Sequence, residues 1–161
     1  MKTQQDLMIK QVLDAWYGQI SRIDKFLEAL NDEQLQHEVA PGRNRGIYLL
    51  GHLAAVHDRM LTLLDFGNRL YPQLDETFIL NPDKSKPDLP STTELRTYWK
   101  EVNNLLAKHF NELSAEDWFK KHTAVSEEDF AKEPHRNKLS IIISRTSHLA
   151  YHFGQMAFLK K

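Results

Sequence analysis

The sequence predicts an all-α fold of the four-helix-bundle class, and three observations support this. Four long segments repeat apolar residues every three or four positions, the period of an amphipathic helix. Long connections at 67–90 and 114–137 precede the third and fourth of these segments. No segment keeps the strict alternation of a half-buried strand, and the isoleucine run at 141–143 leads directly into helical spacing. We therefore expect one domain over 1–161, a bundle with at least one overhand crossover.

The first two predicted helices lie in the N-terminal half of the chain. The first covers 4–30, with apolar residues at Ile9, Val12, Leu13, Trp16, Ile20, Ile23, Leu27 and Leu30. Asn31 and Asp32 are weak helix stops, and Pro41-Gly42 indicates a break soon after. The second covers 45–66, is apolar around much of its circumference, and is followed by a Gly-Asn pair at 67–68. That composition is typical of the residues just past a helix C-terminus.

The third predicted helix runs over 91–113, and its STTE sequence at 91–94 is typical of a capping box. The fourth covers 138–158, with an apolar stripe at Ile142, Leu149, Phe153 and Met156. The connection 67–90 holds four of the six prolines, and we expect it to be ordered but irregular. The connection 114–137 contains SAED at 114–117 and SEED at 126–129, and each predicts the start of a short helix.

Composition narrows the classes of function. The chain has 161 residues, 27% of them charged, and a formal net charge of −1. So balanced a charge argues against nucleic acid or an anionic membrane as a partner, since both require clustered Lys and Arg. The absence of cysteine excludes disulfides, thiolate metal ligands and a Cys nucleophile, so a metal site would use His, Asp or Glu. No apolar run resembles a signal peptide or a membrane span, so we expect a cytoplasmic protein.

Two of the eight histidines, His148 and His152, form an HxxxH pair on the fourth predicted helix. At about 100° per residue they are offset by only about 40°, so both imidazoles face one side, one turn apart. Such a pair alone is a weak signal, because half-buried histidines without a metal are common. His52 strengthens it. His52 lies about two turns from the start of the second helix and the pair about two turns from the end of the fourth, so antiparallel helices would bring all three to one height.

Three neutral imidazoles with an open fourth position are typical of a catalytic zinc site. We expect zinc or nickel, and iron or manganese would also fit, because ligand type selects poorly among these ions. Leu50, Leu53, Leu149 and Phe153 would supply a dry wall around the ion.

The other histidines are weaker candidates. His57 points about 140° away from His52 on the same helix, and His109 lies on the third helix, so we expect both to be surface or core residues. We expect His37, His122 and His135, which lie in connections, to be solvated. The sequence has no HExxH, ExxH, GxSxG, P-loop or GxGxxG motif, which removes the metalloprotease, ferritin-like, serine-hydrolase and nucleotide-binding interpretations.

GHL at 51–53 and HLAYHFGQM at 148–156, almost a hundred residues apart, together resemble the DinB-like family of four-helix bundles, also called the YfiT-like metal-dependent hydrolases. The resemblance covers the whole chain, and it places the family's ligand triad on His52, His148 and His152. The chain departs from the family just before the second helix, where many relatives have a Trp-Ser segment and this one has Arg-Asn-Arg-Gly at 43–46. That departure leaves the substrate open and does not affect the metal ligands.

The resemblance implies an up-down-down-up bundle, a single divalent ion and a homodimer. Relatives with known activities include transferases and isomerases that use low-molecular-weight thiols, so it also implies a small-molecule substrate, with such a thiol as one candidate. The family's name refers to induction by DNA damage and gives no support for DNA binding.

Neighbours of the triad provide candidate catalytic residues. Tyr48 lies one turn before His52 and Gln155 three residues after His152, and in antiparallel helices both steps lead to the same end of the bundle. Tyr48 would hydrogen-bond a ligand on the ion, and Gln155 would orient a substrate or a water beside it; alternatively, Tyr48 only packs and Gln155 is solvated. Arg59 and Arg145 share the ligand-bearing faces on the other side of the triad, and we expect them to pair with an acid or turn outward.

Three functions remain open from the sequence. The first is a metal-dependent enzyme of the thiol-transferase or hydrolase type, since an ion on three imidazoles lowers the pKa of water or of a thiol. No conspicuous general base accompanies the ligands, which favours thiol activation over peptide hydrolysis. The second is a stress or interaction protein in which the ion only braces two helices, with His57, His109 or a carboxylate filling the fourth position. The third is a dimerisation module without a metal.

Overall fold

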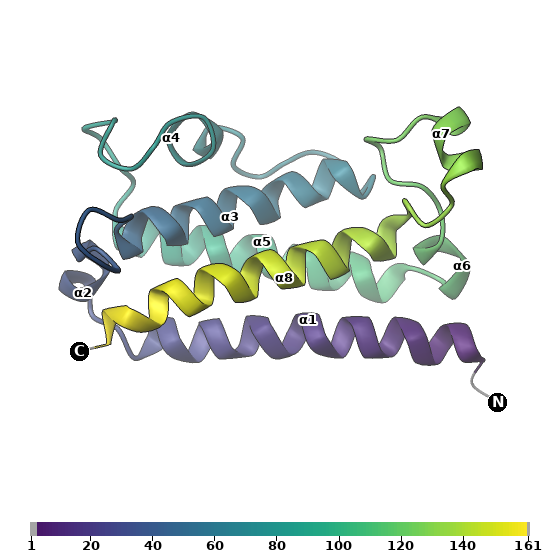
Figure 1. Ribbon diagram of the computed structural model, residues 1–161, viewed down its shortest axis with the longest axis horizontal. Coiled ribbons are helices and arrows are strands. Elements are labelled where there is room, and N and C mark those ends of the chain that lie inside the picture. The colour runs from purple at the N-terminus through teal and green to yellow at the C-terminus, as the bar shows by residue number, and fades with distance from the viewer. Residues whose placement is uncertain (1–2, 161) are drawn as a thin grey trace.

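Four long helices form the body of the molecule in a computed structural model that describes residues 3–160 (Figure 1). They are α1 (Gln4–Glu28), α3 (Gly46–Leu63), α5 (Thr92–Glu112) and α8 (Lys138–Met156). α1 and α8 run in one direction along the bundle, and α3 and α5 run in the other (Figure 1). The predicted four-helix bundle and its up-down-down-up order are therefore confirmed.

The connections contain four short helices, α2 (Asp32–Gln36), α4 (Leu74–Phe78), α6 (Ala115–Trp118) and α7 (Glu127–Lys132), and a 3₁₀ turn at Ala157–Leu159 follows α8. The helix starts predicted at 114 and 126 are confirmed, because Ser114 caps α6 and Ser126 caps α7. The sequence did not predict α2 or α4. The helix stop expected near Asn31 is confirmed, since α1 ends at Glu28, and Asn31 also begins α2, because its side chain accepts from the backbone N–H of Gln34.

Side-chain caps set the N-terminal ends of three of the long helices. Thr3 caps α1, Ser91 caps α5 within the predicted capping box, and Asn137 caps α8. α3 differs, because its N-cap residue Arg45 makes no side-chain cap bond. The Arg45 backbone N–H donates instead to Asp83 at 2.8 Å, and the Arg45 guanidinium pairs with the same carboxylate. The start of α3 is thus tied to the long crossover that follows it in sequence.

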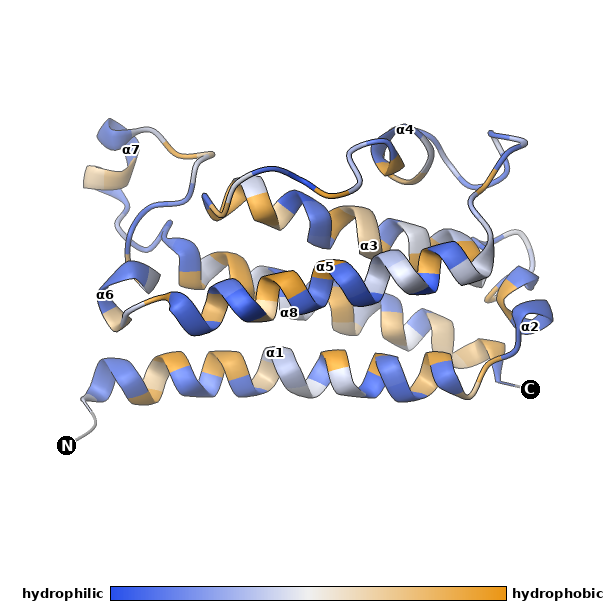
Figure 2. Cartoon of the chain, turned by 180° about the vertical axis from the view of Figure 1, so that it is seen from behind, coloured by the Kyte–Doolittle hydropathy of each residue, from blue (hydrophilic) through white to orange (hydrophobic). Residues whose placement is uncertain are grey.

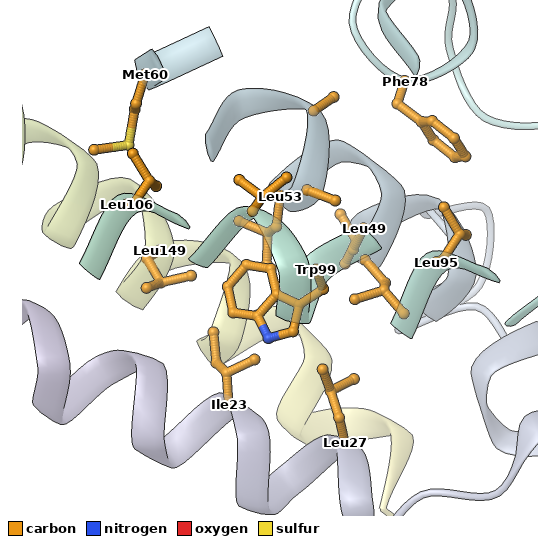
Figure 3. Close-up of a cluster of buried hydrophobic side chains, with 14 of the residues drawn as sticks. Ile23, Leu27, Leu49, Leu53, Met60, Phe78, Leu95, Trp99, Leu106 and Leu149 are labelled. Carbon is orange, nitrogen blue, oxygen red and sulfur yellow. The ribbon is translucent and has the colours of Figure 1, made fainter. Parts of the chain in front are cut away.

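The closest packing joins α3 with α5 and α1 with α8, two pairs of parallel neighbours. Hydrophobic residues recur along each long helix between hydrophilic ones (Figure 2). The apolar faces meet in one core, where the indole of Trp99 lies among Ile23, Leu27 and Leu53 (Figure 3). Burying each such leucine contributes roughly 1.5–3 kcal/mol. This core holds the helices at fixed heights relative to one another.

Hydrogen bonds hold the 67–90 crossover against α3. The fully buried carboxylate of Asp58 accepts from Arg69 at 2.8 Å and from the backbone N–H groups of Leu70 and Tyr71 at 2.8 and 3.2 Å. Further along, the Tyr48 hydroxyl donates to the carbonyl of Asn81 at 2.7 Å. The crossover is therefore ordered, as predicted, and it keeps α4 in place over α3.

Gly51 allows α4 to approach α3 closely. A Cβ built on Gly51 would lie 2.3 Å from the ring of Phe78, which no ordinary packing contact tolerates. Phe78 is fully buried in this position (Figure 3). Its backbone is thereby fixed beside His52, the residue that follows Gly51.

Within residues 3–160, no helix has both the length and the hydropathy needed to span a membrane.

Candidate metal centre

Three imidazoles meet between α3 and α8. The Nε2 atom of His148 lies 3.2 Å from Nε2 of His52 and 3.1 Å from Nε2 of His152. The ring centroids are 4.5–5.2 Å apart, and all three side chains are half-buried. The sequence prediction that these three histidines share one height in the bundle is confirmed; that they bind a metal stays a prediction.

The donor set fits a divalent ion. Tetrahedral coordination with metal–nitrogen bonds of about 2.0–2.1 Å separates neighbouring nitrogens by about 3.3–3.4 Å. The observed separations of 3.1 and 3.2 Å are close to that value. Two imidazole lone pairs facing each other at this distance repel unless a proton or a cation lies between them. The three residues can therefore hold a metal ion without moving far.

Two of the three rings are oriented by hydrogen-bond acceptors on their far side. The Nδ1 of His52 donates to the backbone carbonyl of Phe78 at 2.8 Å, and the Nδ1 of His152 donates to the side-chain oxygen of Gln155 at 2.8 Å. With the proton on Nδ1, each Nε2 presents its lone pair to the centre. Gln155 thus contacts a candidate ligand directly. The Nδ1 of His148 is enclosed and has no hydrogen-bond partner among the described residues.

The environment keeps these histidines neutral near pH 7. Burial lowers the pKa of His148 to about 4, and the neighbouring histidines and Arg145 add to the effect. Burial also lowers the pKa of His52 and of His152, against the opposing hydrogen bonds to Phe78 and Gln155. A neutral imidazole is the form that donates a lone pair to a metal. All three residues are therefore available as ligands at neutral pH.

No further side chain of a ligand type joins the group in the described part of the chain. His57 is fully buried, its ring lies 4.8–4.9 Å from those of Trp16 and Trp99, and its Nδ1 contacts Asn103 at 2.8 Å. His109 stacks on Phe66 with centroids 4.7 Å apart. Neither is a fourth ligand, as the sequence predicted.

The remaining histidines give a mixed result. His37 and His135 are exposed, as predicted. The prediction for His122 was wrong, because this residue is buried. It lies in a connection, but its Nδ1 accepts from the backbone N–H of Ala124 at 3.3 Å within an ordered turn. The periodicity of the sequence carries no information about such a turn.

Tyr48 is buried and stacks nearly parallel to His52, with centroids 6.5 Å apart. Its hydroxyl donates to the carbonyl of Asn81, on the crossover. In this structure Tyr48 therefore supports the segment that orients His52, and its expected contact with a ligand on the ion stays a prediction.

The two arginines on the deeper side of the triad differ from each other. Arg59 pairs with Asp75 at 2.8 Å, as predicted. Arg145 has no acidic partner among residues 3–160 and does not turn fully outward, so that prediction was wrong for this residue. It is half-buried, its Nε is enclosed without a partner, and burial lowers its pKa.

Two hollows in the surface are relevant to the site, one beside Gln155 and one over two buried tryptophans. One, of about 330 Å³, adjoins Gln155 at the end of the bundle and is lined by Val39, Ala40, Arg43, Tyr151, Gln155 and Phe158. The other, of about 430 Å³, lies between α1 and α5 over Trp16 and Trp99 and touches none of the three histidines. Gln155, which contacts His152, lines the first hollow, but none of the three histidines lines either one.

Comparisons with known proteins agree with the fold. A family model described as the DinB superfamily matches residues 15–156. Among solved structures, the crystal structure of a conserved protein from Enterococcus faecalis is similar with a TM-score of 0.62 at 14% sequence identity. That similarity covers 99% of this chain and 96% of the other, and at this identity it concerns the fold alone. No curated protein sequence matches the chain significantly.

Proposed function

The chain belongs to the DinB superfamily, and from that premise we propose that it is a metal-dependent enzyme of the thiol-transferase or hydrolase type. His52, His148 and His152 would hold a divalent ion, zinc or nickel by preference. The main support is the convergence of three Nε2 atoms with no fourth protein ligand of the His, Asp or Glu type among the described residues. When bound, such an ion supplies Lewis acidity and lowers the pKa of a water or a thiol toward neutrality.

The protein's own groups would prepare the site for that chemistry. Phe78 and Gln155 hold the protons of His52 and His152 on Nδ1, which leaves the Nε2 lone pairs free. Leu53 and Leu149 directly follow two of the candidate ligands and are fully buried, so both ligand-bearing helices turn an apolar face into the core beside the centre. That packing keeps water out of the core at the height of the histidines.

Thiol transfer is the reaction that this site favours. No carboxylate belongs to the three-histidine group among residues 3–160, so no side chain there serves as an obvious general base for peptide hydrolysis. A thiol needs only to lose its own proton to become a nucleophile. We accordingly propose a small-molecule substrate with a low-molecular-weight thiol, and a homodimer as the working assembly.

A second function, a metal brace without chemistry, is favoured by one observation. His52 comes from the α3–α5 pair and the other two candidate ligands from the α1–α8 pair, so an ion would join the two halves of the bundle. A purely structural ion needs a closed coordination shell. The accessibility of the ion therefore separates the two functions.

The first measurement is the metal content of the purified protein and of three variants, His52→Ala, His148→Ala and His152→Ala. We expect near-stoichiometric zinc or nickel in the natural chain and a large loss in each variant, while His109→Ala, a half-buried histidine on another helix, keeps its metal. Full occupancy in all three variants would show that the ligands lie elsewhere.

The second measurement separates enzyme from brace. In a cobalt-substituted protein, added cysteine, azide or imidazole should change the visible spectrum, because each ligates an accessible ion. The same preparation loaded with its native metal should transfer a thiol to an activated chloroarene. A spectrum indifferent to all three ligands would favour the brace.

A further inference from the structure

Arg145 shares a helix face with two of the candidate metal ligands. It precedes His148 by three residues and His152 by seven, spacings that place the three side chains on one side of α8. The step from Arg145 to His148 is about 4.5 Å along the helix axis. The guanidinium is half-buried, and its enclosed Nε has no hydrogen-bond acceptor among the described residues.

The lack of a counter-ion distinguishes Arg145 from the other half-buried arginines. The other half-buried arginines that the structure describes each have a carboxylate within 4 Å: Arg45, Arg69, Arg96 and Arg136. Even the more exposed Arg59 makes a two-point contact with Asp75. A partly buried cation without a counter-ion is unfavourable by itself, so it calls for an explanation outside the protein's own side chains.

Another cation acts on Arg145. Arg59 adds to the effect of burial in lowering the pKa of Arg145, and Arg59 is itself paired with Asp75 at 2.8 Å. Arg145 thus has no counter-ion among the described residues on the deeper side of the three-histidine centre, and a divalent ion would add positive charge beside it.

We propose that Arg145 binds an oxyanion of the substrate, a carboxylate or a phosphate, and that the substrates of this centre are small anions. The proposal rests on the proposed function for the identity of the site, and it adds the class of substrate. A guanidinium presents two parallel N–H groups that match either oxyanion in a two-point contact. An anion bound to Arg145 would supply the negative charge that the guanidinium lacks, and this anion would lie beside the candidate ligand His148.

The test is anion binding by the protein as purified, measured by isothermal titration calorimetry in a low-salt zwitterionic buffer. Inorganic phosphate and malonate are the two probes, and the tighter one identifies the oxyanion class. We expect saturable binding in the natural chain and a loss of tenfold or more in affinity in Arg145→Gln. Arg145→Lys should fall between the two, because it keeps the charge and loses the two-point geometry.

Two arginines serve as controls. Arg22→Gln removes an exposed arginine on α1, away from the site, and should leave binding unchanged. Arg43→Gln tests the hollow beside Gln155 and should reduce affinity less than Arg145→Gln. Removing an unpaired half-buried charge should not harm folding, and circular dichroism of each variant checks this.

Repeating the titrations after the metal has been removed by dialysis separates the anion site from the ion. Binding that persists without metal and depends on Arg145 supports the proposal even if the centre proves not to be catalytic. No saturable binding of either probe, equal affinity in Arg145→Gln, or a larger loss in Arg43→Gln would each overturn it.

Discussion

The candidate ligands are oriented by two acceptors of different kinds. His152 relies on the side-chain oxygen of Gln155, whereas His52 relies on the main-chain carbonyl of Phe78. A substitution can remove the first acceptor directly. It can move the second only by shifting the backbone of α4. Position 155 is therefore where a single substitution changes the metal affinity of the centre with the least effect on the fold.

We expect Gln155→Leu to weaken metal binding by about 10–100-fold, because His152 then loses the partner that fixes its proton on Nδ1. Gln155→Glu is the matched variant. It keeps an acceptor, now charged, and should bind the metal at least as tightly as the natural chain. Competition with a chromophoric chelator measures both affinities. Equal affinity in Leu and Glu variants would mean that the hydrogen bond to His152 does not matter for the ion.

His57 gives a prediction about pH, measured on metal-free protein. Burial lowers its pKa to about 3 in the folded state, whereas an unfolded histidine titrates near about 6.5. Above that pH neither state takes a proton. As the pH falls, the unfolded chain binds a proton at this residue that the folded chain does not bind. The free energy of unfolding therefore falls by about 1.4 kcal/mol per pH unit between about pH 6 and 3.

His57→Asn should therefore make the acid loss of stability shallower by about that slope, whatever its effect at pH 7. His37→Asn, at an exposed histidine, should leave the slope unchanged. Urea unfolding at a series of pH values measures both. Parallel pH profiles for the natural chain and His57→Asn would show that His57 becomes protonated while folded.

At the scale of helices, the sequence predicted the long elements well because each has a strong period and most begin at a side-chain cap. Ser91, Ser114 and Ser126 were recognisable from sequence since a cap and its partner lie three residues apart. α2 and α4 were not, because helices of five residues are too short to show a period and are stabilised by tertiary contacts. Leu35 and Phe78, one in each, are fully buried.

The candidate site was predictable from sequence where it depends on the spacing of residues along a helix, as the long helices themselves were. Spacing along two helices predicted which histidines meet. Phe78 could not be identified as a partner of His52, because a main-chain carbonyl has no residue type and its position depends on the crossover. The lack of an acidic partner for Arg145 could not be predicted from sequence either, because it depends on which acidic side chains the fold brings near it.

Gly51 makes the α3–α4 contact testable. Gly51→Ala places a methyl group against the Phe78 ring, and the resulting displacement should destabilise the fold by about 1–3 kcal/mol. Because the Phe78 carbonyl also orients His52, the affinity for the metal should fall as well. Gly18→Ala is the control: it lies in α1 with no atom within 4 Å of its Cβ, and it should stabilise by about 0.5–1 kcal/mol. Normal stability and metal affinity in Gly51→Ala would contradict this account.

For the molecule as a whole, the apolar core is independent of the three-histidine centre. Leu53, Trp99 and Leu149 belong to one buried hydrophobic cluster that joins α3, α5 and α8 and does not include the three histidines (Figure 3). This distinguishes the chain from small domains whose folding requires a metal.

We accordingly expect the metal-free protein to keep its helical circular dichroism and to unfold cooperatively. Metal should raise the melting temperature, and a free ion concentration of 100 times Kd should add about 2.7 kcal/mol to the free energy of unfolding. The triple variant with His52, His148 and His152 all changed to Ala should unfold cooperatively and gain nothing from added metal. Loss of helical signal on chelation would contradict the prediction.

The pairing of the helices has a mechanical consequence. α3 with α5 and α1 with α8 form two parallel units, and the three imidazoles lie where one unit meets the other. An ion there is a crosslink across the seam along which the two units would slide past each other if they were pulled in opposite directions. Under such a load, the force needed to separate the units should rise when the ion is bound and fall when it is chelated. A bundle of this design can thus convert the availability of a metal into resistance to force without changing its fold.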